Sequence, residues 1–146
     1  RGLGDVYKRQ ELGYQFTPHI ILEGYDLAAN AFMLGEDLPL TLYWTAEDPP
    51  DVDLKVFLHL YDLQGNLVAQ VDQRPQHDTR PPYAWLPGEQ IRDPYQLYLP
   101  PDLEPGYYDL ALGMYDPLSN ERVVITSPAG EILPEGRLPL DRIVVR

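Results

Sequence analysis

The stretch LPLTLYWT, residues 38–45, decides the fold class. Its large apolar side chains stand at every second position: Leu38, Leu40, Leu42 and Trp44. In an extended chain such residues share one face, whereas a helix would scatter them around its circumference. Residues 38–45 are therefore predicted to form a strand with one buried face.

The same alternation recurs along the chain. It is clear in residues 54–62, 66–72, 95–99 and 108–114, and weaker in 19–25, 122–126 and 142–146. Gly65 can adopt a positive φ and predicts a hairpin between residues 54–62 and 66–72. The apolar run 27–34 would make only two turns of helix, so it is better interpreted as a loop or strand edge.

About eight short strands, with turn signals every roughly 8–15 residues, are typical of a sandwich or barrel. We therefore predict an all-β fold, an antiparallel β-sandwich of the immunoglobulin or fibronectin-III-like kind. The side chains expected to point inward include Leu40, Leu42, Leu58, Leu110 and Leu112.

Composition limits the possible functions. The chain of 146 residues suits one domain, and its 16 prolines favour short strands and turns over long helices. It contains no cysteine, which excludes disulfides, thiolate metal sites and cysteine nucleophiles. No apolar run approaches the ~18 residues that a membrane-spanning helix requires.

The first ten residues, RGLGDVYKRQ, need separate treatment. They resemble translated sequencing-adapter read-through at the end of a metagenomic contig, so residues 1–10 are expected to be a non-native or disordered tail. The expected domain is 11–146, and the natural protein would continue upstream of Glu11. The decapeptide carries a net charge of +2, so the chain's −12 becomes −14 over residues 11–146. Phosphate backbones and anionic membrane surfaces would be repelled, and no nucleic-acid partner is expected.

Several ordered motifs resemble a known family. They are residues 85–89 (WLPGE), Asp93 and Tyr95, residues 105–107 (PGY), residues 113–116 (GMYD) and residues 56–60 (VFLHL). Together they are similar to the C-terminal β-sandwich of bacterial multi-span membrane glycosyltransferases of the dolichyl-phosphate-mannose mannosyltransferase-like (family 39-type) class. The resemblance spans nearly all of residues 14–146.

The resemblance implies a non-catalytic accessory or interaction domain on the extracytoplasmic side of the membrane. It would be tethered through upstream transmembrane helices, with the transferase chemistry outside this fragment. The resemblance assigns no catalytic residue here, and neither a cofactor nor a metal is expected. The expected partners are the parent's own membrane domain or a glycan.

The long loop 73–89 is the best candidate for a ligand site. It holds Trp85, Tyr83, Arg80 and His77. Aromatic rings stack on sugar rings, and Arg and His form directional hydrogen bonds to hydroxyls, so a carbohydrate-binding module is the alternative function. The competing interpretation, which we favour, is that Trp85 folds back and seals one end of the sandwich.

Other polar groups favour structural roles. The acidic stretch 47–53 could supply oxygen ligands to calcium but lacks an EF-hand register, so a solvated charge run is favoured. Asp62 and Asp116 each follow a Tyr at a strand end and suit the first position of a β-turn. Carboxylate pairs for glycoside hydrolysis stay open, because spatial distance decides them.

Overall fold

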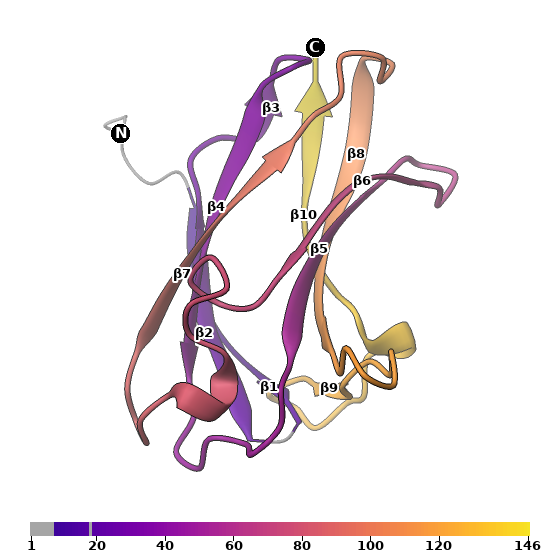
Figure 1. Cartoon of the computed structure of the whole chain (residues 1–146). Helices are drawn as coiled ribbons and strands as arrows, with labels where there is room; N and C mark the ends of the chain where they lie inside the picture. The colour runs from indigo at the N-terminus through magenta and orange to yellow at the C-terminus, as the bar shows by residue number, and fades with distance from the viewer. Residues whose placement is uncertain (1–7, 18) are drawn as a thin grey trace.

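The computed structural model describes residues 8–17 and 19–146 and shows two five-stranded sheets packed face to face (Figure 1). The first sheet has the order β7 (Ile91–Tyr98), β4 (Asp37–Thr45), β2 (Ile20–Leu27), β1 (Lys8–Phe16) and β9 (Ile125–Thr126). The second has the order β3 (Ala31–Phe32), β10 (Leu138–Val145), β8 (Gly106–Tyr115), β5 (Lys55–Tyr61) and β6 (Leu67–Gln73). The predicted all-β sandwich is confirmed.

The strand count and one pairing differ from the prediction. The described residues contain ten strands, because β1 and β3 were not predicted. All pairings between named strands are antiparallel except that of β3, which runs parallel to β10 through Ala31 and Phe32. The only helices among the described residues are two short 3-10 turns, η1 (Pro82–Ala84) and η2 (Pro134–Gly136), and neither could cross a membrane.

The predicted domain boundary falls inside β1. This strand begins at Lys8, whose backbone pairs with that of Leu27 in β2, and the pairing continues past residue 11. Backbone pairing therefore extends into the segment set aside as a tail. The remainder of that prediction, on residues 1–7, lies outside the described residues.

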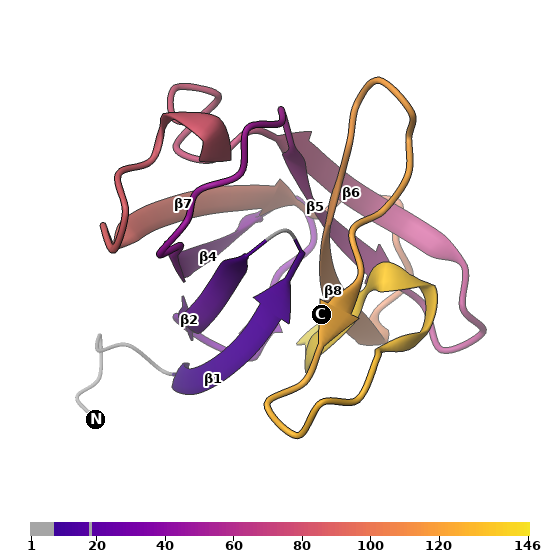
Figure 2. The same cartoon turned by 90° about the horizontal axis from the view of Figure 1, so that it is seen from below.

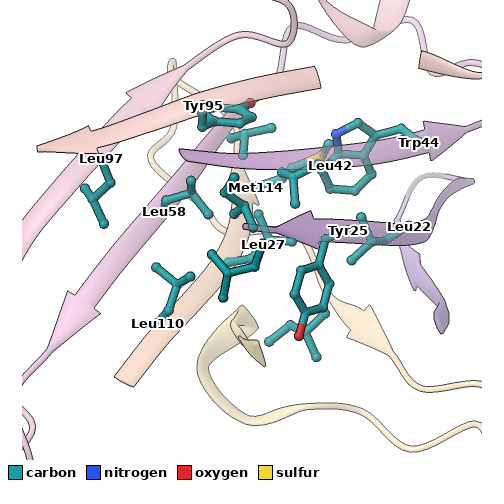
Figure 3. Close-up of a cluster of buried hydrophobic side chains, with 14 of the residues drawn as sticks. Leu22, Tyr25, Leu27, Leu42, Trp44, Leu58, Tyr95, Leu97, Leu110 and Met114 are labelled. Carbon is teal, nitrogen blue, oxygen red and sulfur yellow. The ribbon is translucent and has the colours of Figure 1, made fainter. Parts of the chain in front are cut away.

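The core lies between the sheets and follows the alternation of the sequence (Figure 3). Every inward residue named from β4, β5 and β8 is at most 1% exposed: Leu40, Leu42, Leu58, Leu110 and Leu112. Trp44 packs edge-on against Phe16, with their ring centroids 5.0 Å apart. The predicted register of these strands is confirmed.

The outer face of the second sheet is partly covered as well. The segment between β8 and β10 crosses it, and in the view from below it lies on the opposite side of the molecule from η1 (Figure 2). Gly113 permits this close approach. A Cβ at that position would lie 2.1 Å from the Phe57 ring and 2.8 Å from the carbonyl oxygen of Gly136.

The predicted turns form as expected. Gly65 has a φ of 87° and donates its N–H to the carbonyl of Asp62. The Asp62 carboxylate accepts the backbone N–H groups of Gln64 and Asn66, at 2.9 and 2.8 Å. Asp116 accepts the N–H of Leu118 in the same way, at 2.8 Å. Both aspartates are therefore turn residues.

Candidate functional site

The loop 73–89 connects β6 to β7 and is closed by its own hydrogen bonds. Asp78 accepts the backbone N–H of Arg74 at 2.7 Å and returns its own N–H to the Arg74 carbonyl at 3.0 Å. Gln76, His77 and Asp78 all have positive φ, between 54° and 66°. Three consecutive residues in this sparsely populated region require support from surrounding contacts. The loop is thus a tightly folded structure.

Trp85 is buried by this fold. It is 4% exposed, and its ring centroid lies 6.5 Å from that of Trp44. Its indole Nε1 donates a hydrogen bond to the Arg80 carbonyl at 2.9 Å. An indole in this position seals the end of the sandwich and presents no open face to a sugar. The platform role considered for Trp85 therefore does not fit the geometry, because packing against Trp44 takes the ring.

The other three predicted site residues lie nearer the surface. The Arg80 guanidinium donates to Glu89 at 2.8 Å and to the carbonyl of Ala84 at 3.0 Å. The hydrogen bond from Arg80 lowers the pKa of Glu89 below its usual range. His77 is exposed, and Tyr83, on η1, is 55% exposed. Only this outer part of the predicted site can reach a ligand.

A buried carboxylate, Asp93 of β7, anchors the loop from below. It is fully buried and accepts three hydrogen bonds: from Trp44 Nε1 at 3.1 Å, from the Tyr95 hydroxyl at 2.7 Å and from the Gln76 N–H at 2.7 Å. Burial raises the pKa of Asp93 to about 6, although the three hydrogen bonds act in the opposite direction.

Asp93 was not predicted to be an anchor, although the sequence contains a signal for this role. Asp93 shares the period-two register of Ile91, Tyr95 and Leu97, all of which are buried. An acidic residue on the inward face of a strand must find hydrogen-bond donors. Trp44, on the neighbouring strand β4, supplies one of them.

An arginine of the 73–89 loop partly neutralises the acidic stretch 47–53. Arg74 forms a two-pronged pair with Asp53, with distances of 2.8 and 2.6 Å. Among the described residues, no group of three or more His, Cys, Asp or Glu side chains is arranged to hold a metal ion. The favoured interpretation of this stretch as surface charge is consistent with that pairing.

A concave surface lies on the outer face of the second sheet. This groove, which we call the Tyr61 groove, has a volume of about 510 Å³ and is lined by β5, β8 and β10. Its polar residues include Tyr61, Asp109, Arg137 and Arg142. The Tyr61 hydroxyl lies 2.9 Å from Nδ1 of His59, whose pKa burial lowers. This groove was not predicted from the sequence.

Comparison with known proteins establishes the fold. No protein-family model and no curated protein matches the sequence. The structure is similar to that of the C-terminal domain of wzt, with a TM-score of 0.53 and 15% identity over 97% of this chain and 82% of that one. It also overlaps part of a β-glucuronidase of Bacteroides uniformis, with a TM-score of 0.42 and 12% identity over 79% of this chain and 14% of that one. At such identities the first likeness supports a shared β-sandwich and leaves the ligand undetermined.

Proposed function

We propose that this chain is a non-catalytic accessory domain of a membrane glycosyltransferase-like protein. Helices encoded upstream would hold it on the extracytoplasmic side of a bacterial membrane. The family resemblance motivates this proposal. What supports it in the structure is the part played by the residues that carry the resemblance.

One part of that set, residues 85–95, lies together at one end of the sandwich and has interlocking structural roles. Trp85 fills the end of the core, and Glu89 accepts the N–H of Leu86 at 3.0 Å while it pairs with Arg80. Asp93 and Tyr95 complete the same unit through their 2.7 Å hydrogen bond. These residues therefore stabilise one end of the sandwich. Such structural roles are expected in an accessory domain that acts through its surfaces and has no catalytic residues.

The test has two parts. Genomic sequence preceding Glu11 should encode several membrane-spanning helices and a glycosyltransferase domain. The isolated chain, incubated with a lipid-linked hexose donor and an acceptor, should transfer no sugar, whereas the complete protein should. An upstream region without spans, or sugar transfer by the isolated chain, would overturn the proposal.

A second candidate function is carbohydrate binding by the outer part of the 73–89 loop. The favourable observation is that Tyr83 is 55% exposed, close in sequence to the fixed guanidinium of Arg80 and to the exposed His77. Tethering near a membrane would raise the effective concentration of ligand, so a shallow site could suffice. Loss of glycan retention in Tyr83→Ala, with an unchanged melting temperature, would support this candidate; unchanged retention would remove it.

A further inference from the structure

The outer face of the second sheet is divided into a covered half and an open half. In the covered half, Arg122 lies over the Phe57 ring, with its guanidinium carbon 4.5 Å from the ring centroid, and Phe57 is 2% exposed. The covering segment is the β8–β10 connection at the lower right of Figure 1. The open half lies toward the β5–β6 turn and the end of β10, and it contains the Tyr61 groove.

Strand register assembles the groove from three distant parts of the sequence. Tyr61 of β5 is directly opposite Asp109 of β8, and Asp109 is directly opposite Arg142 of β10. Residues directly opposite one another share a face of the sheet, so the three side chains form one row across the outer surface. The next row places Ala111 beside Pro139, and these two small residues also line the groove.

The polar groups of this row are fixed in position. Arg142 donates Nε and one terminal nitrogen to the two oxygens of Asp109, at 2.8 and 3.2 Å. Arg137 stacks on Tyr61, with its guanidinium carbon 4.4 Å from the ring centroid. The Asp109 and Arg142 side chains are nevertheless 42% and 59% exposed. They are held in place but remain open to solvent, in contrast to the buried polar groups around Asp93.

This arrangement matches the chemistry of a sugar. Each sugar hydroxyl both donates and accepts, and an Arg–carboxylate pair offers donors and acceptors side by side. Arg137 lies over the Tyr61 ring, so the planar guanidinium that this ring supports adds a surface that can pack against a pyranose ring. A groove of about 510 Å³ lies within the usual range for small-molecule sites.

The charges of the groove and of the whole chain limit the class of sugar that the groove can bind. The groove is lined by Asp62, Asp109 and Asp141 against the two guanidinium groups of Arg137 and Arg142. The chain as a whole carries a formal charge of −12. Such a field disfavours nucleic acids, phosphorylated lipids and polyuronates. Neutral sugars carry no charge and are therefore not repelled by this field.

We propose that the Tyr61 groove binds a neutral oligosaccharide, with Tyr61 and Arg137 as the stacking surface and Asp109 and Arg142 as the hydroxyl-binding pair. This site lies on the outer face of the second sheet, and none of its lining residues belongs to the 73–89 loop, which links that sheet to the first. It is independent of the accessory role, because the groove could bind sugar whatever the parent protein is.

The experiment titrates the isotopically labelled chain with neutral trisaccharides of mannose, of α-linked glucose and of β-linked glucose, at millimolar concentration. Backbone resonances of β5, β8 and β10 around the groove should shift, while those of residues 73–89 should not. Tyr61→Ala and Arg142→Gln should each weaken binding at least about tenfold. Tyr98→Ala, which removes a 53% exposed tyrosine from β7 in the other sheet, is the matched control and should bind as the wild type does.

The outcomes separate the two candidate sites. Shifts confined to residues 73–89, abolished by Tyr83→Ala, would move the sugar site to the loop and overturn the groove. Absence of any shift with all three neutral sugars would overturn it too. So would a parallel titration in which only the acidic trisaccharide trigalacturonate binds. If Tyr61→Ala unfolds the chain, Arg142→Gln and Asp109→Asn carry the test, since both change exposed side chains.

Discussion

The 73–89 loop and the Tyr61 groove use the same types of residue to different ends. Each contains an arginine–carboxylate pair, a tyrosine and a neighbouring histidine. In the loop, Trp85 is buried, as is the loop's anchor Asp93 in β7, and the hydrogen bonds run within the molecule. In the groove, the Arg142–Asp109 pair is about half exposed. Exposure, more than residue type, separates a structural polar network from a surface that can exchange its partners for a ligand.

The largest effect expected from this difference is in Trp85→Ala. Removing a buried indole should lower the free energy of unfolding by about 3–5 kcal/mol, because packing against Trp44 is lost and the Arg80 carbonyl loses its donor. Chemical denaturation of the intact chain measures this loss. The adjacent Leu86→Ala, at a side chain that is 65% exposed, should change stability by less than about 0.5 kcal/mol. Equal losses for the two variants would show that Trp85 does not seal the core.

Asp93→Asn tests the anchor through pH. Because the pKa of Asp93 in the folded chain, about 6, exceeds the usual 3.8, the folded state binds more protons than the unfolded state between these values. This group's contribution to the free energy of unfolding therefore falls as the pH rises through that window. Relative to the Asn variant, the wild type should gain up to ~3 kcal/mol as the pH is lowered from 7 to about 4.

The control for this prediction is Asp48→Asn, which removes the same charge from an exposed position. Denaturant melts at several pH values should show that only Asp93→Asn flattens the dependence on pH. Parallel curves for wild type and Asp93→Asn would contradict the buried, proton-binding anchor.

The part of the fold that sequence predicts well is the part with one buried face. The alternation of Leu38, Leu40, Leu42 and Trp44 survives unchanged in β4, because each of these side chains meets the opposite sheet. β1 was missed because residues 1–10 were set aside as a tail and because a bulge between Glu11 and Tyr14 interrupts the pairing of the rest. β3 has two residues, too few for any periodic pattern.

Candidate sites were harder to predict because they depend on pairing between distant segments. Loop length and composition drew attention to Trp85, but whether its ring is open or buried depends on Trp44, which the sequence does not place. The Tyr61 groove needs the register of β5, β8 and β10 at once. No local pattern around Asp109 or Arg142 indicates that they meet.

The two arginine pairs offer a smaller test. Arg80→Gln should cost up to about 1 kcal/mol, because its pair with Glu89 is about 30% exposed on each side and also holds the Ala84 carbonyl. Arg142→Gln should cost less than Arg80→Gln, because that pair is more exposed and more screened. Thermal melts at low and high salt measure both. A larger loss from Arg142→Gln would mean that the groove row is structural.

The smallest change in stability is expected for Tyr83→Ala, and its comparison with Tyr61→Ala compares the loop with the groove. The Tyr83 side chain is 55% exposed on η1, and the loop keeps its internal hydrogen bonds and the buried Trp85 without it. Tyr83→Ala should therefore stay within about 0.5 kcal/mol of the wild type. Tyr61→Ala removes both the stacking with Arg137 and the contact with His59, and should cost about 1–2 kcal/mol. Denaturation curves of the two variants, measured side by side, test both expectations. If Tyr83→Ala proves the more damaging, the loop depends on its exposed ring, and the assignment of that loop to structure through Trp85 and Asp93 is incomplete.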